Sequence, residues 1–422
     1  MRSSSLRRPI VLALAATAAA LSLAGPAAAG GQSAPSTRVF SGFTLIDGTG
    51  AAPVPNAVMV VRNGRIVEVG QAADVKIPAG AERISLDGKF VVPGLINAHG
   101  HASSVANLRT SAAYGVTTVY SLGDESDEVF AAREAQRHTS PAHARVYVAG
   151  PVLAPTDSAD ARAKVFAVAA RRVDIVKIRV DDNLGTAPKM RPEVYRSVIL
   201  GAHARGLRVA AHLYYLDDAK ALLTAGADYL AHSVRDQAVD DAFVQQLKTS
   251  KVCYSPTLMR EVSTFVYDTV PAFFRDSFFL AHANREWMAT VQEPQRMQNV
   301  RTSSSAQRYK AQLPVAIANM MALHRAGVPI AMGTDTGPLG RFQGYFELME
   351  LEMMVDAGFT PMEALRAATG VAARCLRIDG LVGTLQAGRA ADLLVLNASP
   401  LETISNLRRQ HSVWIGGKRL AN

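Results

Sequence analysis

The feature that most constrains the fold is an alternation in the middle of the chain, where short apolar stretches alternate with helix-like segments. The apolar stretches lie at 90–101, 117–122, 145–149, 174–179, 207–212, 229–232, 252–256 and 330–334. Strands that alternate with helices are typical of a parallel sheet, and eight strands are the number that a closed (β/α)₈ barrel needs. We therefore predict an α/β protein built on a TIM barrel.

The helix-like segments include 217–225 and 361–376. Thr360 is a good N-cap residue, Pro361 suits the first helical turn, and Glu363 completes a capping box. These residues predict that a helix begins at Pro361.

The two ends of the chain have a different character from its middle. From Arg38 to Phe90 the sequence shows short strands and turns, with a strong hairpin turn at Asn63-Gly64, and strand-like segments return at 391–396 and 412–417. We expect one small β-sandwich domain from residues 37–92 and 380–422, with the barrel, residues 93–379, inserted between them.

The first 29 residues resemble a secretory signal peptide. Arg2, Arg7 and Arg8 precede an apolar run from Ile10 to about Leu23, and the small residues 27–29 suit cleavage. The apolar run is short for a transmembrane anchor, so we predict export to the periplasm or medium, with no stable membrane anchor after cleavage. Leu6 and Pro9 fit a twin-arginine signal poorly, and the export route stays open.

Charge and cysteine content limit the classes of partner. Removal of the three N-terminal arginines lowers the formal charge from +9 to +6, and no run of five Lys or Arg occurs, which argues against nucleic acid. Cys253 and Cys375, the two cysteines, lie in apolar strand-like and helix-like runs. A disulfide is one option, but we expect two buried free thiols.

A long insertion of about 70 residues, centred on 258–312, separates the last two predicted strands. It carries many aromatic residues: Phe265, Tyr267, Phe273, Phe274, Phe278, Phe279 and Trp287. We expect most of them to form a satellite core, with one or two facing the substrate.

Histidines and one aspartate recur where predicted strands end. His99 and His101 are two residues apart and so point to the same side of a strand, where they can share one metal ion. His212, His232 and Asp335 each end a later strand, and side chains at these ends converge in a barrel. The other histidines lie in helix-like or loop segments and are expected at the surface.

Lys177 lies in the apolar strand 174–179, where a buried ammonium group would be costly. One interpretation is an ion-paired or snorkelling lysine at the strand end. The other is a lysine carboxylated by CO₂, whose two oxygens bridge two metal ions, since a buried lysine deprotonates readily.

Several motifs together give the chain a family resemblance. They are Asp47-Gly48-Thr49-Gly50, the stretch Val92 to His101, Lys177 on the fourth strand, His212, His232, Gly333-Thr334-Asp335 and the tail from Gly383 to Leu393, with Arg389 where lysine is commoner. With these motifs the chain resembles the metal-dependent amidohydrolase superfamily over nearly its full mature length. It is most similar to the imidazolonepropionase-like and Xaa-Pro dipeptidase-like branch.

The resemblance implies a binuclear metal centre. His99, His101 and Asp335 would hold the buried ion, and His212 and His232 the more exposed one, with carboxylated Lys177 and a hydroxide bridging the pair. Asp335 would take the proton of the hydroxide and pass it to the leaving amine. Zinc is the default metal, and manganese or cobalt fits the same ligands.

The predicted function is hydrolysis of an amide or peptide C–N bond in a small substrate with a free carboxylate, as in a dipeptidase, carboxypeptidase or N-acyl amino acid hydrolase. Candidate substrate contacts follow the metal-site strands: Arg179, Arg235, Arg260, Tyr214 and Tyr215. The alternatives are a cyclic-amide hydrolase or deaminase with one metal, a lactonase or phosphoesterase, and a non-enzymatic binding module. No serine-nucleophile motif is present, and the sequence leaves self-assembly open.

Overall fold

The computed structural model describes residues 37–421, and the predicted signal peptide therefore lies outside the described residues. Within 37–421 no helix has the length and apolar character that a membrane crossing requires.

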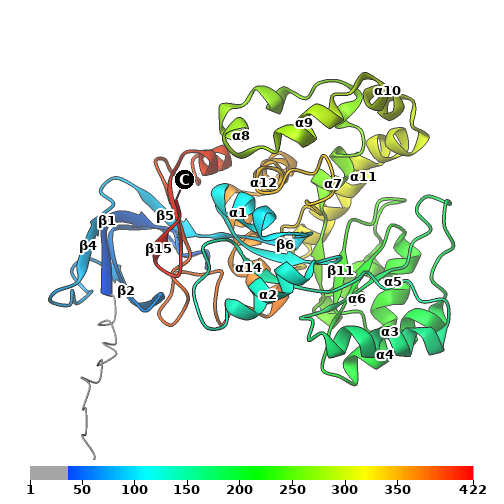
Figure 1. Cartoon of the computed structure of the whole chain (residues 1–422), viewed down its shortest axis with the longest axis horizontal. Coiled ribbons are helices and arrows are strands. Elements are labelled where there is room, and N and C mark those ends of the chain that lie inside the picture. Colours follow the sequence, from blue (N-terminus) through cyan, green and yellow to red (C-terminus); the bar gives the residue numbers. More distant parts are fainter. Residues whose placement is uncertain (1–36, 422) are drawn as a thin grey trace, which may run out of the picture. The chain divides into compact units, whose positions relative to one another are not determined.

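Strands from both ends of the chain form one sheet. Its order is β15-β14-β13-β5-β1-β2-β3, and β4 pairs with β1 (Figure 1). The predicted turn at Asn63-Gly64 is confirmed, because both residues have positive φ and Arg62 pairs with Arg65 across the hairpin. The strands are β1 (Thr37–Leu45), β2 (Val54–Arg62), β3 (Arg65–Gln71), β4 (Glu82–Ser85), β5 (Phe90–Pro93), β13 (Leu393–Leu396), β14 (Gln410–Ile415) and β15 (Lys418–Arg419).

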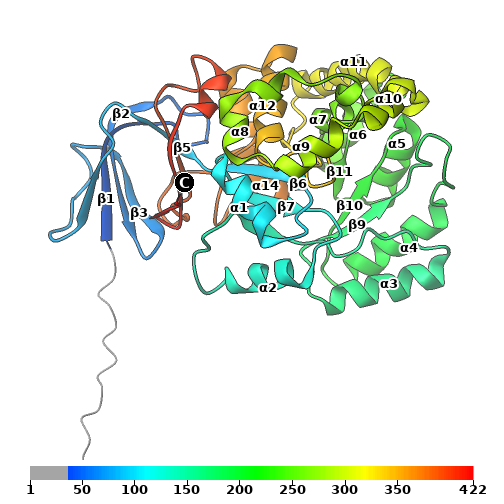
Figure 2. The ribbon, with the colours of Figure 1, turned by 45° about the horizontal axis from the view of Figure 1, so that its top comes forward.

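Parallel strands occupy the middle of the chain. Their hydrogen bonds form two sheets, one in the order β6-β7-β8 and one in the order β12-β11-β10-β9, and every pairing is parallel (Figure 2). The strands are β6 (Leu95–Gly100), β7 (Val116–Ser121), β8 (Arg145–Tyr147), β9 (Val176–Arg179), β10 (Val209–His212), β11 (Tyr229–Ala231) and β12 (Cys253–Ser255).

The eighth predicted strand, 330–334, is not a regular strand. Ile330 makes an isolated parallel bridge to Tyr254, and Thr336 makes another to Gly100. Gly333 and the left-handed backbone of Asp335 interrupt the extended conformation between these two bridges. A third bridge, between Leu153 and Ile178, connects the two sheets.

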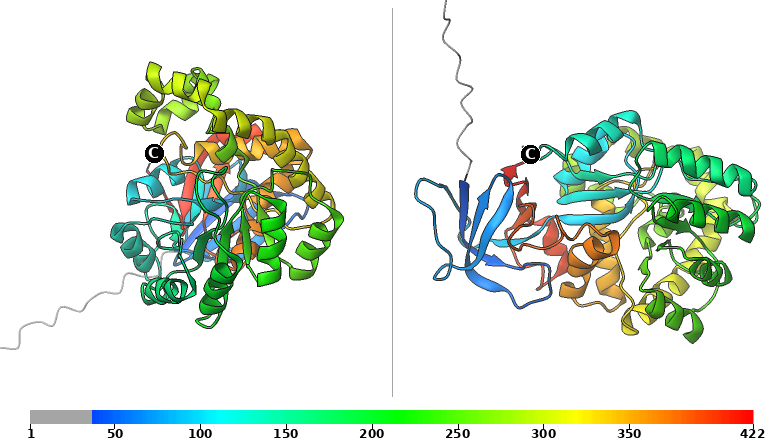
Figure 3. Two further views of the ribbon diagram at one scale, coloured as in Figure 1. Left: turned by 90° about the vertical axis from the view of Figure 1, so that its right-hand side faces the viewer. Right: turned by 90° about the horizontal axis from the view of Figure 1, so that it is seen from below.

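Helices cover the outer side of the parallel strands (Figure 3). Most begin with a side-chain cap; for example, Asp240 accepts from the backbone N–H of Phe243, and Gly226 ends its helix in a left-handed conformation. These helices are α1 (Val105–Ala113), α2 (Asp127–Ala135), α3 (Ser158–Ala170), α4 (Pro192–His203), α5 (Leu216–Ala225), α6 (Asp241–Ser250) and α12 (Tyr345–Ala357).

The predicted helix 361–376 is two helices, α13 (Pro361–Ala367) and α14 (Gly370–Leu376), so its predicted continuity was wrong. The start is confirmed, because Thr360 and Glu363 form the expected capping box. The break lies at Thr369, whose backbone is not helical. Gly370 packs against the backbone of Gly48, where a Cβ atom would lie 2.5 Å from the Gly48 oxygen. This close approach is a contact that sequence periodicity does not reveal.

The long insertion is helical and has its own core. Tyr267, Phe274 and Phe279 are buried there, with Phe273, Phe278 and Trp287 packed against them, which confirms a satellite core for most of the predicted aromatics. Its elements are α7 (Leu258–Val262), η1 (Val266–Asp268), η2 (Ala272–Arg275), α8 (Ser277–His282), α9 (Arg285–Val291), α10 (Pro294–Thr302) and α11 (Ser304–Arg325), and a further short helix near the C-terminus is η3 (Ile404–Arg408).

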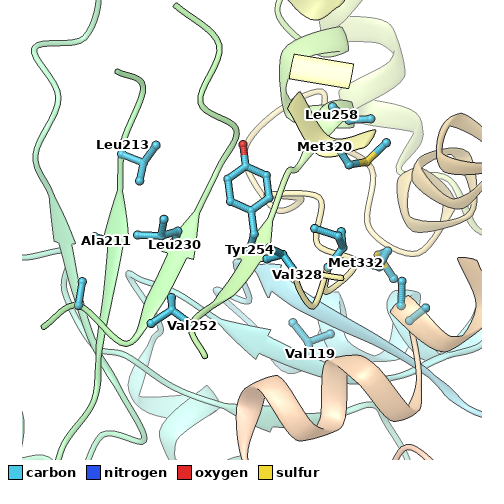
Figure 4. Packing of buried hydrophobic residues seen from close by; sticks show 14 of the residues in the cluster. Val119, Ala211, Leu213, Leu230, Val252, Tyr254, Leu258, Met320, Val328 and Met332 are labelled. Atoms are coloured by element: carbon cyan, nitrogen blue, oxygen red, sulfur yellow. The ribbon is translucent and has the colours of Figure 1, made fainter. Parts of the chain in front are cut away.

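The main core lies between the parallel strands and their helices. Ala211, Leu213 and Leu230 project from neighbouring strands toward this layer, and Val328 and Met332 continue it on the segment that replaces the eighth strand (Figure 4). This apolar layer holds the strand ends rigidly, as a functional site requires.

Cys253 and Cys375 form a disulfide, so the expectation of free thiols was wrong. Cys253 begins β12 and Cys375 lies near the end of α14, 122 residues later. The fold brings their Cα atoms to 5.7 Å, a normal spacing for a disulfide. The pairing depends on this tertiary proximity, which the local character of the two apolar runs does not encode.

Candidate metal centre

The six predicted ligand residues lie at or just beyond the carboxyl ends of parallel elements. His99 lies in β6 and Lys177 in β9, while His212 ends β10. His101 and His232 directly follow β6 and β11, and Asp335 lies on the irregular segment that takes the place of the eighth strand. Because these elements run parallel, their carboxyl ends meet at one edge, and the side chains converge there.

Distances show that the six side chains form one group, which we call the ligand cluster. Nε2 of His99 lies 3.1 Å from Nζ of Lys177 and 3.1 Å from Oδ1 of Asp335. Nε2 of His101 lies 2.9 Å from the same Asp335 oxygen. The His232 ring is 4.4 Å from the His99 ring and 4.1 Å from the His212 ring, measured between centroids.

The donor set of His99, His101 and Asp335 fits a metal ion. One ligand atom from each residue lies within 4.8 Å of the other two. Nδ1 of His101 lies 3.0 Å from the carbonyl oxygen of Gly123, and a hydrogen bond from Nδ1–H leaves the Nε2 lone pair for a metal. Nδ1 of His232 likewise lies 2.8 Å from the Thr257 hydroxyl.

Burial sets the protonation states that metal binding needs. It lowers the pKa of His212 to about 4 and also lowers the pKa values of His99 and His232, so these rings are neutral near pH 7. Burial alone would raise the pKa of Asp335, but the positive charge of Arg341 and a hydrogen bond with His101 hold it well below its usual value. The cluster therefore offers neutral imidazoles and an ionised carboxylate.

Lys177 is almost fully buried, with 2% of its surface exposed. This burial lowers its pKa to about 7, so a large share of the amine is neutral near physiological pH. A neutral amine is the form that adds to CO₂.

Backbone strain is concentrated in the cluster. His232 and Asp335 both have positive φ, at 94° and 58°, a region that non-glycine residues rarely adopt. Gly333 allows the Asp335 segment to approach β6, because a Cβ atom there would lie 2.8 Å from Cβ of His99. Strain of this kind persists where the surrounding structure enforces it, which is common at functional sites.

A buried polar network behind His99 was not predicted from the sequence. Asn97 donates to the Thr334 hydroxyl at 2.9 Å and to Glu347 at 2.6 Å, and its oxygen accepts from the backbone N–H of His99 at 3.0 Å. This network joins β6 to the Asp335 segment. Asn97 stands two residues before His99, on the same side of the strand, and this spacing is the one signal that could have indicated it.

Asp181 is a second residue that sequence reasoning missed. Its carboxylate lies 3.0 Å from Nε2 of His212 and accepts from Nε of Arg179 at 2.9 Å. Asp181 stands two residues beyond the end of β9, a position equivalent to those of the other strand-end residues. It is therefore a candidate orienting partner for His212.

Arg341 is a third residue that sequence reasoning missed. Its guanidinium pairs with Oδ2 of Asp335 and donates to the Ser263 hydroxyl at 3.1 Å. The turn that begins after Asp335 contains Gly337 and Gly340, both with positive φ, and returns the arginine to the cluster. A glycine-containing turn just after a ligand-bearing segment was the available signal.

The predicted substrate contacts lie beside the cluster in different environments. Arg179 pairs with Asp181, and the Tyr215 hydroxyl donates to Asp182 at 2.9 Å. The Tyr214 ring is buried, with the Arg235 guanidinium 4.6 Å from its centroid.

Arg235 and Arg260 share a partner. Both pair with the buried carboxylate of Glu261, at 3.1 and 3.2 Å. Arg260 also donates to the Tyr309 hydroxyl at 3.2 Å, and its Nε has no hydrogen-bond partner among the residues described. Buried positive charge therefore exceeds buried negative charge here.

Comparison with known proteins places these features in a family context. The model of the Amidohydrolase family matches residues 90–420, which is most of the chain. An imidazolonepropionase from Streptomyces coelicolor is 27% identical over 379 residues, which cover 82% of this chain and 86% of that protein. An ochratoxinase from Aspergillus niger is 39% identical over 99 residues, which are 22% of this chain and 20% of the ochratoxinase.

Solved structures share the fold over nearly the whole described chain. A candidate prolidase from Bifidobacterium longum has a TM-score of 0.76 and 27% identity, covering 92% of this chain and 95% of its own. A Xaa-Pro dipeptidase with bound methionine has a TM-score of 0.74 and 21% identity, covering 92% and 100%. The similarity to the Xaa-Pro dipeptidase concerns the fold alone.

Proposed function

The chain belongs to the amidohydrolase family, and we propose that this hydrolase is an exported binuclear metalloenzyme that cleaves an amide or peptide C–N bond of a small carboxylate-bearing substrate. The observation that carries the proposal is the ligand cluster, in which buried Lys177 lies 3.1 Å from His99 among four histidines and Asp335.

The assignment of ligands follows from the donors in the cluster. His99, His101 and Asp335 would hold one divalent ion and His212 and His232 a second, with Lys177 carboxylated between them. Carboxylation joins the nitrogen of the neutral lysine amine to the carbon of CO₂ and releases one proton, which gives an anion. Counted from the ammonium form, two protons are released and the side chain changes from a cation to an anion. Zinc fits these nitrogen and oxygen donors, as do manganese and cobalt. When bound, the ions supply an activated water and polarise the scissile carbonyl.

The residues of the chain position the reactants and move the proton. Asp335, kept ionised beside Arg341, takes a proton from the attacking water and passes it to the leaving nitrogen. Asn97 and Glu347 fix the strand that carries His99. Asp181 orients His212.

The substrate class follows from the arginines beside the cluster. Arg235, Arg260 and Arg341 lie around Glu261, so a substrate carboxylate would balance the remaining positive charge. Tyr214, Tyr215 and Arg179 would supply further substrate contacts. A dipeptide or an N-acyl amino acid with an apolar C-terminal residue fits this arrangement, and the likeness to a candidate prolidase supports it.

We also propose the wider architecture: a signal peptide over 1–29, a β-sandwich from 37–92 and 380–422, and a closed (β/α)₈ barrel over 93–379. The bridges of residues 330 and 336 to the strands on either side support closure. The disulfide is compatible with an oxidising compartment and so supports export.

Metal analysis and Lys177 variants test the binuclear centre. We expect two divalent ions per chain, and Lys177→Ala should lose both ions and turnover, with partial rescue of both by a short carboxylic acid. Lys177→Arg should be inactive as well, because guanidinium forms no carbamate and keeps its charge. Lys76→Ala, at an exposed lysine of the shared sheet region, is the matched control. Full activity with one ion per chain would instead favour the cyclic-amide hydrolase or deaminase alternative.

Paired substrates test carboxylate recognition. Amidation of the C-terminal carboxylate should lower kcat/KM at least about tenfold, since a charged hydrogen bond contributes about 1.5–3 kcal/mol. Arg260→Gln should lower kcat/KM for the free acid and remove most of this discrimination, whereas Arg196→Gln, at an exposed site, should not. Equal rates on both substrates would contradict the proposed recognition of the carboxylate, but would not contradict the proposed metal centre.

A further inference from the structure

A cavity of about 610 Å³ lies at the opposite ends of the parallel strands from the ligand cluster. Its wall includes Cys253, the first residue of β12, and Ile330, on the segment that replaces the eighth strand. The ligand-cluster residues lie at the carboxyl ends of the strands, so this basal cavity is separate from the candidate metal centre. Its volume is in the range of small-molecule sites.

The basal cavity has an apolar part. Val328, Ile330, Phe359 and Val371 line it together with the Cys253–Cys375 disulfide. The disulfide joins β12 to α14 and so ties two walls of the cavity together. A wall held by a covalent bond is preorganised for a ligand.

The lining of the basal cavity also carries positive charge. Lys251, Arg366 and Arg374 line the cavity, and none of them has a carboxylate partner within 4.0 Å among residues 37–421. The Nε atom of Arg366 is buried and has no hydrogen-bond partner in the same part of the chain.

Glu363, the one acidic residue in the lining, offsets only part of this charge, and the charge of Arg366 is among the causes that lower its pKa, after its hydrogen bonds to Thr360. Its carboxylate accepts from the backbone N–H and the hydroxyl of Thr360, both at 2.8 Å, and lies 3.4 Å from Nε2 of His324. The hydrogen bonds of Glu363 thus cap the start of α13. The cavity keeps an excess of positive charge beside an apolar wall.

We propose that the basal cavity binds an organic anion with an apolar body and a single carboxylate, such as an arylalkanoate. The apolar wall would bury the body, and Arg366 and Arg374 would hold the carboxylate, a group that guanidinium recognises in a bidentate manner. This second site lies beyond the proposed hydrolase activity and does not rest on it.

Titration calorimetry of the full chain with 3-phenylpropionate tests the site. The wild type should bind it, and 3-phenylpropionamide, the neutral analogue, should bind at least about tenfold more weakly. The double variant Arg366→Gln/Arg374→Gln should also lose at least about tenfold in affinity. Arg377→Gln is the matched control, because Arg377 is exposed just after α14 and does not line the cavity.

A filling variant provides an independent readout. Val371 is half-buried, so Val371→Trp can place its ring in the cavity, and binding should be lost while the circular dichroism spectrum stays unchanged. Absence of wild-type binding up to about 10 mM, far weaker than ordinary ligand affinities, would overturn the proposal. Binding that survives in the double variant and disappears in His99→Ala would also overturn it, because the anion would then bind at the metal centre.

Discussion

The ligand cluster and the aromatic core of the insertion are both buried, yet they are built on opposite principles. The ligand cluster gathers polar side chains with positive φ at His232 and Asp335. The aromatic core gathers apolar rings; Phe279, for example, lies 5.0 Å from Phe342 and 4.9 Å from Tyr345 between ring centroids. Burial therefore tunes the protonation of polar groups in the ligand cluster, whereas in the aromatic core it supplies stability.

The largest expected effect is that of His99→Ala, which should affect activity and leave stability nearly unchanged. His99 is fully buried, and its polar contacts run through Nε2 to Lys177 and Asp335 within the ligand cluster, so its loss removes contacts of the cluster rather than apolar packing. We expect turnover to fall at least about 10³-fold, as for removal of an essential active-site group, with unfolding free energy changed by less than about 2 kcal/mol. Steady-state kinetics and denaturant unfolding measure the two effects, and exposed His138→Ala is the control. Retained turnover would remove His99 from the site.

Phe279→Ala should give the reverse result. Deleting a fully buried phenylalanine costs about 3–5 kcal/mol, and we expect this loss of unfolding free energy with kcat/KM of the folded protein changed by less than about threefold. The matched control is Phe166→Ala, at a ring that is 64% exposed, where the change should stay within about 0.5 kcal/mol. A large loss of kcat/KM in folded Phe279→Ala would show that the aromatic core also shapes the site.

The Cys253–Cys375 disulfide concerns both the ligand cluster and the aromatic core, because both lie in or against the chain loop that it closes. This loop contains the insertion and Asp335. Cys253→Ala/Cys375→Ala should lower the unfolding free energy by about 2–4 kcal/mol, because the unfolded chain gains freedom. Calorimetry of the variant, and of the wild type with and without reductant, measures the change. An unchanged Tm in the variant would contradict a stabilising role.

The smallest expected effect is a pH dependence that belongs to the ligand cluster. In the metal-free protein burial lowers the pKa of His212 to about 4, so below pH 6.5 the unfolded chain binds more protons than the folded one. Stability from this histidine is therefore present above pH about 6.5 and is lost as the pH falls toward 4, by on the order of 1–3 kcal/mol. Urea unfolding across this range should show a shallower slope for His212→Gln than for His138→Gln. Equal pH dependence of the unfolding free energy in the two variants would contradict a lowered pKa of His212 in the folded protein.

Much of the site could be predicted because strand ends carry a local signature. His99, Lys177 and Asp335 stand at such ends in recognisable motifs, and parallel topology then brings them together. For Arg341 the one local signal was the glycine-containing turn that follows Asp335. Glu347 could not be predicted, because its partner is set by a helix that packs behind the strand.

The fold, like the site, has parts that local sequence signals predict and parts that depend on contacts between distant residues. Periodicity and turn residues predicted the hairpin at Asn63-Gly64 and the start of α13. They did not predict the break at Thr369 or the disulfide, which depend on contacts between residues far apart in the sequence, such as Gly48 with Gly370. Local propensity is readable in the sequence, whereas packing between distant segments is not.

The shared sheet of the two chain ends has a consequence for the order of folding. β5 leads directly into β6, which carries His99, and β5 pairs with β13, where Val92 lies opposite Leu394. A growing chain reaches this partner only 300 residues after the end of β5, since β5 ends at Pro93 and β13 begins at Leu393. The strand that leads into His99 is therefore fully paired only once β13 has been made, and chains truncated before residue 393 would leave β5 without a partner on that side, exposed to association with other chains.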